Sequence, residues 1–396
     1  MRTRQAYLVF VAVLLIFGNT EIFAQISNSG VKLFLDRNAV LYVQGNYKHD
    51  AGEVLNNGTI TVLGDWKSND KVFQDASVGT VVMNSVASNL SGTATFPNLV
   101  FKGNGTYQLN GKFDARLSLD IDDSIILLFL PEGLRLLNSN PLSLTRKEGY
   151  ISSLSIDASF VRFMDNDEDY LYPMGVSDLR RFVVLKPKDA NTNQMAVSFI
   201  AKDPNSEGFS RLSKTKSVGE INDAYYHKIK RMGGTSPFDV TFLMPSSEKF
   251  TGLAAWVRNI HWDRMISTNT VKSGSGAAYM AQAMLHKNAN LPLGSEVPFA
   301  LAQITNASPL EFYNAFSPDG DGRNDTWEIK NIDAFPDNDL KIFDRSGNLV
   351  YRMNSYNSTK YWDGKNVSSG TYIYILRVKI DGKDEHFKGS ITMVKN

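Results

Sequence analysis

A glycine–aromatic pattern that repeats near the start of the chain constrains its fold most strongly. Gly45 and Tyr47 recur as Gly64 and Trp66, so both residues are offset by 19 positions. Such an offset is close to one coil of a β-solenoid, in which short strands stack and Gly or Asn occupies the corners. A plain antiparallel sandwich is the alternative, because repeat proteins usually need about three units. We favour the solenoid-like fold for residues 25–149.

The rest of this region also consists of short strand-like segments separated by Gly, Asn and Pro turn signals. These segments are Thr80–Met83, Asn98–Lys102, Thr106–Leu109, Leu117–Ile121, Ile125–Leu130 and Leu134–Leu137. The chain contains 23 Phe, 16 Tyr and 29 Gly, a composition typical of strands joined by tight turns. We therefore expect an all-β fold.

Residues 150–305 predict a second unit, a β-sandwich-like middle domain. Its strand-like segments are Phe160–Phe163, Phe182–Leu185, Met195–Ile200, Phe238–Leu243, Ala254–Arg258 and Phe299–Ala302. Only Ala277–His286 has the composition of a helix. The strand pattern breaks near Thr305–Leu310, which is where we place the last domain boundary.

Residues 1–24 have the organisation of a signal peptide. Arg2 and Arg4 precede the apolar run Ala6–Phe17, and a cut after Ala24 would leave Gln25 as the first residue. The apolar run is shorter than the roughly 20 residues that a membrane-spanning helix needs. The chain has no cysteine, so disulfides, an N-terminal lipid anchor and zinc thiolates are excluded.

Charge and motif content argue against two classes of function. The 42 basic and 41 acidic side chains are well mixed, with a formal net charge of +1, so we expect no nucleic-acid partner. The five histidines are scattered, and no HExxH, GxSxG or phosphate-binding loop is present. We therefore expect a protein that is not an enzyme. Paired carboxylates of a glycoside hydrolase are a spatial arrangement, so a secreted polysaccharide-binding protein or hydrolase stays as the alternative.

Two groups of residues in the middle region are candidates for binding surfaces. Lysines and an arginine between Lys214 and Arg231 alternate with Tyr225 and Tyr226, a pattern that suits acidic glycans, a partner protein or a solvated strand edge. Exposed aromatics can stack on sugars, but core packing is the favoured interpretation. The aromatic residues concerned are Trp256, Trp262 and Tyr279.

The last part of the chain carries several separated motifs in a specific order. They are Asn314–Ile329, Ile332–Pro336, Ile342–Gly347, Val350–Tyr351, Tyr361–Gly364, Gly370–Tyr374 and Lys388–Thr392. This order resembles the gliding-motility-associated C-terminal domain, the type B sorting domain of the type IX secretion system of Bacteroidetes-type bacteria. The resemblance covers residues 310–396. Here Ser346 precedes Gly347 where other members often have Trp, a change confined to a surface turn.

The resemblance implies a route and a set of partners. The signal peptide takes the chain across the inner membrane, and the type IX translocon recognises the C-terminal domain. An outer-membrane β-barrel of the kind that accompanies gliding adhesins then holds the protein at the cell surface, unless it is released outside. Surface glycans or other adhesin subunits are further partners. The residues themselves predict a small C-terminal β-sandwich, with strands at Leu340–Phe343, Leu349–Arg352, Tyr372–Val378 and Ser390–Val394.

Aromatic and glycine residues of this domain have predicted structural roles. Trp327 and Trp362 lie among turn residues and are expected to plug the ends of the sandwich, in preference to stacking on a ligand. Four glycines are expected where the backbone needs a positive φ. They are Gly347, Gly364, Gly370 and Gly389.

An acidic turn in the same domain predicts a calcium site. Asp319, Asp321 and Asp325 lie in a glycine-rich turn that can wrap carboxylates around a hard cation. Two features differ from an EF-hand loop, because Arg323 occupies the fifth position and Lys330 the twelfth. A network of Asx turns is the alternative interpretation.

Overall fold

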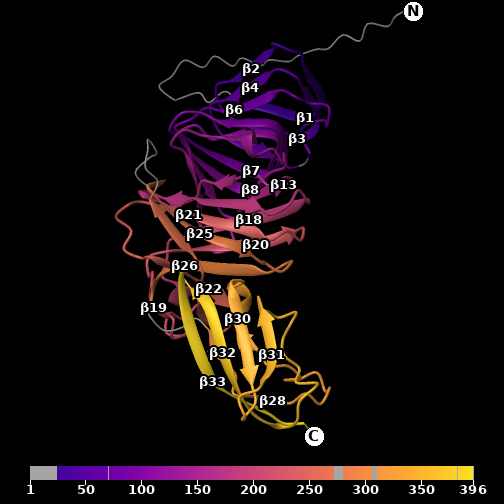
Figure 1. Ribbon diagram of the computed structural model, residues 1–396. Coiled ribbons are helices and arrows are strands. Elements are labelled where there is room, and N and C mark those ends of the chain that lie inside the picture. Colours follow the sequence, from indigo (N-terminus) through magenta and orange to yellow (C-terminus); the bar gives the residue numbers. More distant parts are fainter. Residues whose placement is uncertain (1–24, 70, 272–279, 306–309, 381, 396) are drawn as a thin grey trace, which may run out of the picture. The chain divides into compact units, whose positions relative to one another are not determined.

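The computed structural model describes residues 25–69, 71–271, 280–305, 310–380 and 382–395 (Figure 1). The predicted signal peptide, residues 1–24, lies outside these ranges. In the described ranges the chain is almost wholly β-structure, which confirms the all-β prediction. Short 3-10 helices include Pro141–Ser143, Pro204–Glu207 and Ile332–Ala334. None of the helices found in these ranges is long and apolar enough to cross a membrane.

The chain divides into two compact units. The first contains the described residues up to 127 together with 144–149, and the second contains 128–143 together with the rest of the chain from 150 onward. Strand β9 (Ile125–Leu128) lies at the division between them.

The first unit is a solenoid of stacked parallel strands (Figure 1). One column contains β1 (Ile26–Leu35), β3 (Tyr47–Asn56), β5 (Trp66–Ser68), β7 (Ala87–Phe101) and β8 (Thr106–Asp120). A second column contains β2 (Val40–Val43), β4 (Thr59–Val62), β6 (Thr80–Met83), the later parts of β7 and β8, and β11 (Leu144–Thr145). Tyr47 lies directly opposite Trp66. The solenoid prediction is confirmed, because an antiparallel sandwich would not give these parallel ladders.

Alternating side chains and stacked aromatic rings fill the solenoid. In β4, Ile60 and Val62 are buried whereas their neighbours are half-buried, as expected of a strand with one face on a core. The rings of Tyr47 and Trp66 stack with centroids 4.4 Å apart, and Phe96 meets Trp66 edge-on at 5.0 Å. Each of these rings contacts a ring on a neighbouring coil, so the contacts in the core join adjacent coils.

The middle region of the second unit is a sandwich of two sheets. The strands of the first sheet are β10 (Leu134–Leu136), β13 (Phe160–Met164), β18 (Asn193–Ile200), β19 (Val218–Ile221), β20 (Tyr226–Gly233), β22 (Gly252–Val257), β23 (His261–Met265) and β26 (Glu296–Ile304). Those of the second sheet are β14 (Tyr170–Tyr172), β17 (Val183–Pro187), β21 (Phe238–Met244), β24 (Thr268–Val271) and β25 (Gln282–Ala289). Phe242 on β21 contacts Phe299 on β26, with ring centroids 5.7 Å apart, so the two sheets face each other. Three short strands flank them: β12 (Tyr150–Ser153), β15 (Gly175–Val176) and β16 (Leu179–Arg180).

The prediction of a helix at Ala277–His286 is wrong for Gln282–His286, which the structure describes as a strand. Residues 272–279 lie outside the described chain, and Gln282–His286 belongs to strand β25. This strand pairs antiparallel with β21 on one side and with β24 on the other. Ala, Met and Leu are good helix formers, but intrinsic helix propensity is a weak preference, and strand pairing on both sides of the segment overrides it.

The C-terminal domain contains a five-stranded sheet in the order β28 (Ala315–Phe316), β33 (Lys383–Met393), β32 (Gly370–Ile380), β30 (Asn338–Phe343) and β31 (Leu349–Asn354). Its other layer consists of the ribbon β27 (Glu311–Phe312) and β29 (Ile329–Lys330) with the turns around it. Strand β28 runs parallel to the end of β33, so the first and last segments of the domain are hydrogen-bonded to each other. This pairing closes the domain on itself.

Candidate functional site in the C-terminal domain

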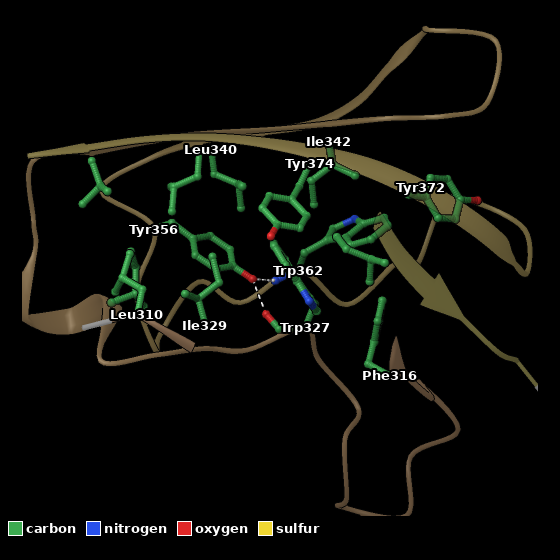
Figure 2. Packing of buried hydrophobic residues seen from close by; sticks show 14 of the residues in the cluster. Leu310, Phe316, Trp327, Ile329, Leu340, Ile342, Tyr356, Trp362, Tyr372 and Tyr374 are labelled. Atoms are coloured by element: carbon green, nitrogen blue, oxygen red, sulfur yellow. Dashed lines mark hydrogen bonds between the residues drawn. The ribbon is translucent and has the colours of Figure 1, made fainter. Parts of the chain in front are cut away.

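The core of the C-terminal domain is organised around a buried tyrosine. Figure 2 shows Tyr356 beneath the sheet with its hydroxyl between the segments of Trp327 and Trp362. The hydroxyl donates to the carbonyl oxygen of Trp327 and accepts from the backbone N–H of Trp362 at 3.0 Å. Burial raises the pKa of Tyr356, so the group stays a neutral hydroxyl that can both donate and accept.

The two tryptophans pair through their backbones as well. The N–H of Trp327 donates to the carbonyl oxygen of Trp362 at 2.8 Å, and the indole Nε1–H of Trp327 donates to the carbonyl oxygen of Tyr313 at 2.7 Å. The ring of Trp327 lies 4.9 Å from that of Tyr374 on β32. Both tryptophans are buried, which confirms that they are core residues. They join the turn-rich layer to the sheet.

A buried asparagine, which the sequence analysis did not identify, joins the backbone at Phe335 to the backbone at Tyr356. Asn338 donates from Nδ2 to the carbonyl oxygens of Phe335 at 2.7 Å and Tyr356 at 3.1 Å. Its Oδ1 accepts from the N–H of Tyr356 at 2.8 Å. The sequence did not identify Asn338 or Tyr356 as core residues, because polar residues in a turn-rich segment are usually exposed.

The glycine predictions are half correct. Gly347 has φ 83° and Gly364 has φ 62°, as expected for turns that need the left-handed region. Gly370 and Gly389 do not have positive φ, so this explanation is wrong for them. A Cβ added at Gly389 would lie 2.7 Å from the ring of Tyr374. Gly389 therefore makes space for a buried aromatic ring.

The acidic turn brings together the three residues predicted to bind calcium. Ligand oxygens of Asp319, Asp321 and Asp325 all lie within 4.8 Å of one another. The carboxylate of Asp325 accepts from the N–H groups of Gly320 at 2.6 Å and Gly322 at 2.9 Å.

The other two carboxylates also bond to the turn. Asp321 accepts from the N–H of Arg323 at 2.7 Å, and Asp319 accepts from the N–H of Asp321 at 3.3 Å. An Asx-turn network is thus present, and carboxylate oxygens of the kind that calcium prefers converge beside it. Calcium binding by this turn stays a prediction.

The basic stretch of the middle region is a surface only in part. Lys228 and Arg231 are buried, and so are Tyr225 and Tyr226. The lysine Nζ lies 2.6 Å from Glu296 Oε1. The solvated-edge interpretation is therefore wrong for these four residues, because the sandwich buries them, whereas Lys214 and Lys216 are exposed. Binding of acidic glycans stays a prediction.

The aromatic residues of the middle region follow the favoured interpretation. Trp256 and Trp262 are buried in one cluster with Tyr226, which confirms core packing. Their rings meet edge-on with centroids 5.6 Å apart. Tyr279 lies outside the described residues.

Apolar side chains are exposed on the outer face of the C-terminal sheet. On β32, Ile373 and Ile375 point away from the core of the domain, and 48% and 43% of their surface is accessible. Leu349 is exposed on β31. Lys341 and Lys388 lie on either side of Ile375 on the neighbouring strands. An apolar strip edged by lysines is a surface suited to a partner.

One of three comparisons with known proteins gave a match, and it covers the C-terminal segment. Neither the curated proteins nor the solved structures gave a match to the chain. A family model matches residues 310–393, the same segment that forms the closed domain with the Tyr356 core. The C-terminal part of this chain is therefore a CHU_C type IX secretion signal domain, and the protein is exported by the type IX secretion system.

Proposed function

We propose that this chain is a non-enzymatic structural or adhesive protein of the cell surface, retained there by an outer-membrane β-barrel partner. One observation carries the proposal: a type IX secretion signal domain follows a solenoid and a β-sandwich in one chain. Stacked-repeat architectures give extended surfaces that suit contact with other macromolecules. A role in a gliding or adhesin assembly follows from this combination, with surface glycans or other adhesin subunits as the molecules contacted.

The outer face of the C-terminal sheet supports retention by a partner. Ile373 and Ile375 are exposed on a sheet whose inner face already carries the core of the domain. Exposed apolar side chains at the centre of a sheet face are costly in water and are typical of interaction sites. We assign this strip, with Leu349 beside it, to the barrel partner.

Two variants separate export from retention. Deletion of residues 310–396 removes the signal domain, so the truncated chain is expected to stay in the periplasm. The double variant Ile373→Lys, Ile375→Lys keeps the core and is expected to be exported but released into the medium. Surface labelling of intact cells and immunoblots of the medium measure both outcomes.

A matched control places the same charges elsewhere on the domain. Asn366 and Ser368 are exposed in the loop before β32, so Asn366→Lys, Ser368→Lys is expected to behave as the unaltered chain. Labelling of the truncated chain on intact cells would contradict the export step. Full retention of the Ile373→Lys, Ile375→Lys variant on cells would contradict the assignment of the strip alone.

A groove in the middle region favours the alternative, a polysaccharide-binding protein. The small residues Ala196 and Ser198 are among its lining residues, and its volume is about 250 Å³. The Lys228 ammonium lies 2.6 Å from Glu296 and 3.9 Å from Asp157 at this groove. Paired carboxylates and an ammonium suit the hydroxyl groups of a sugar. They suit hydrolysis less, because the lysine lies between the acids, where a glycosidase needs room for the scissile bond.

A further inference from the structure

The first coil of the solenoid has an unpaired edge. Among the described strands, β1 pairs with β3 and β2 pairs with β4, and neither has a partner on its other side. Backbone N–H and C=O groups on such an edge are free to pair with another chain. A bulge held by Asn28, which bonds the N–H and C=O of Val31, disturbs only the early part of β1. The pairing is regular again from Lys32 to Leu35.

Outward-facing side chains on β2 are more apolar than the side chains paired with them on the coil that follows. Val40 and Tyr42 on β2 are 66% and 54% exposed, whereas the residues paired with them on β4 are Thr59 and Thr61. On β1, Phe34 is 60% exposed. Natural sheet edges are usually protected by charges, proline or a covering element. This edge carries the charged residues Lys32 and Asp36, but it also presents the exposed apolar residues Phe34, Val40 and Tyr42 beside unpaired backbone, as a docking strand does.

The sequence of the regular part of β1 is complementary to itself. It runs Lys32, Leu33, Phe34 and Leu35, and Asp36 follows directly after the strand. Exposed side chains alternate with more buried ones along it, so Lys32, Phe34 and Asp36 share the outer face. If two copies pair antiparallel about a two-fold axis at Phe34, Lys32 of each copy faces Asp36 of the other, and Leu33 faces Leu35. Opposite charges directly across an antiparallel pair stabilise it.

We propose that the chain beginning at Gln25 forms an isologous dimer through β1, centred on Phe34. An isologous contact uses the same patch on both copies and therefore ends at two chains. The backbone turns after Asp36, where the N–H of Ala39 donates to the Asp36 carbonyl oxygen at 3.0 Å. The paired segment is short for this reason, so the dimer forms in a concentration-dependent equilibrium. The proposal does not depend on the proposed function.

Charge exchange across the axis tests the proposed register. Sedimentation velocity and light scattering on residues 25–396 are expected to show a monomer–dimer equilibrium. Lys32→Asp or Asp36→Lys alone places like charges opposite each other twice in the dimer, so we expect the dissociation constant to rise about tenfold or more. The double exchange Lys32→Asp, Asp36→Lys restores opposite charges and is expected to restore dimerisation.

The design separates dimerisation from folding. Lys32 forms an ion pair with Glu53 at 3.1 Å, and the single variant Lys32→Asp and the double exchange lose that pair equally. Lys67→Asp alters another exposed lysine of the solenoid and is expected to leave the dimer unchanged. A chain that stays monomeric at every concentration would overturn the proposal. So would single and double charge variants that dimerise alike.

Discussion

The solenoid and the C-terminal domain each bury a tryptophan at their centre but hold it differently. Trp66 stacks on Tyr47 of the preceding coil and meets Phe96 of a following one. Trp327 bonds to three separate segments and lies in a domain in which β28, near the start, pairs with β33, at the end. Stability in the solenoid is therefore a sum of neighbouring coils, whereas the sorting domain is closed and cooperative. A closed unit suits a signal that must be recognised as a whole.

Replacement of Trp66 or Trp327 should give the largest difference between the solenoid, whose coils are stabilised by their neighbours, and the C-terminal domain, which unfolds as a whole. Trp327→Ala removes a large buried ring and its hydrogen bond, a loss of about 3–5 kcal/mol. We expect all of residues 310–393 to lose protection from hydrogen exchange, and export to fail. Trp66→Ala has a similar local cost but should deprotect only the adjoining coils. Exchange measured by mass spectrometry on the full chain resolves the segments, and protection lost evenly along the solenoid would contradict the comparison.

Glycine substitutions sharpen the comparison at a smaller scale. A Cβ on Gly92, where φ is +93°, would meet the carbonyl oxygen of Ser68 on the coil before, and neither backbone can move far. Strain of this kind costs about 1–3 kcal/mol before the clash is counted. Gly389→Ala meets the Tyr374 ring instead, which can shift, so its loss should be smaller. Gly103→Ala, at φ +77° with open space around it, is the control for strain alone.

Urea unfolding, followed separately for each segment, ranks the three glycine variants by their loss of unfolding free energy. The expected order is Gly92→Ala largest, with Gly389→Ala and Gly103→Ala below it. A Gly92→Ala chain as stable as Gly103→Ala would show that the coils can separate without cost. The close main-chain contact between coils would then not be a source of stability.

The solenoid was predictable because its signal is local in space as well as in sequence. The 19-residue offset placed Tyr47 opposite Trp66, and those residues are true neighbours on adjacent parallel strands. The same approach divided β7 and β8 into shorter pieces. Gly92 and Gly111 fall between the predicted strand segments, although they lie inside long strands where successive coils approach closely. Glycine serves both purposes, and sequence alone does not separate them.

Sequence patterns could not predict which residues are buried by contacts between segments far apart in the chain. Tyr356 and Asn338 look like surface residues until the C-terminal domain closes over them. Lys228 looks like part of a basic surface until the sandwich buries it against Glu296. The acidic turn was predicted correctly as a cluster because its three carboxylates come from seven consecutive residues. Short-range clusters are therefore the part of a candidate site that a sequence identifies best.

Calcium should have the smallest effect and should act on one region only. Asp319, Asp321 and Asp325 converge on the C-terminal domain, and calcium sites of extracellular modules have dissociation constants of about 10⁻⁴–10⁻³ M. With a constant near 1 mM, 2 mM calcium would stabilise the domain by about 0.6 kcal/mol. Thermal unfolding with calcium or with a chelator should shift slightly for this domain and not for the solenoid.

Two variants identify the source of that shift. Asp321→Asn keeps an oxygen that can accept the N–H of Arg323, now bonded at 2.7 Å, but removes a charge from the cluster. It should abolish the response to calcium while leaving the unfolding midpoint in chelator nearly unchanged. Glu385→Gln removes an exposed charge from β33 and should leave the calcium response intact. A midpoint that chelator does not move would assign the acidic turn to Asx-turn geometry alone, and the sorting domain would then owe its closure entirely to its core and strand pairing.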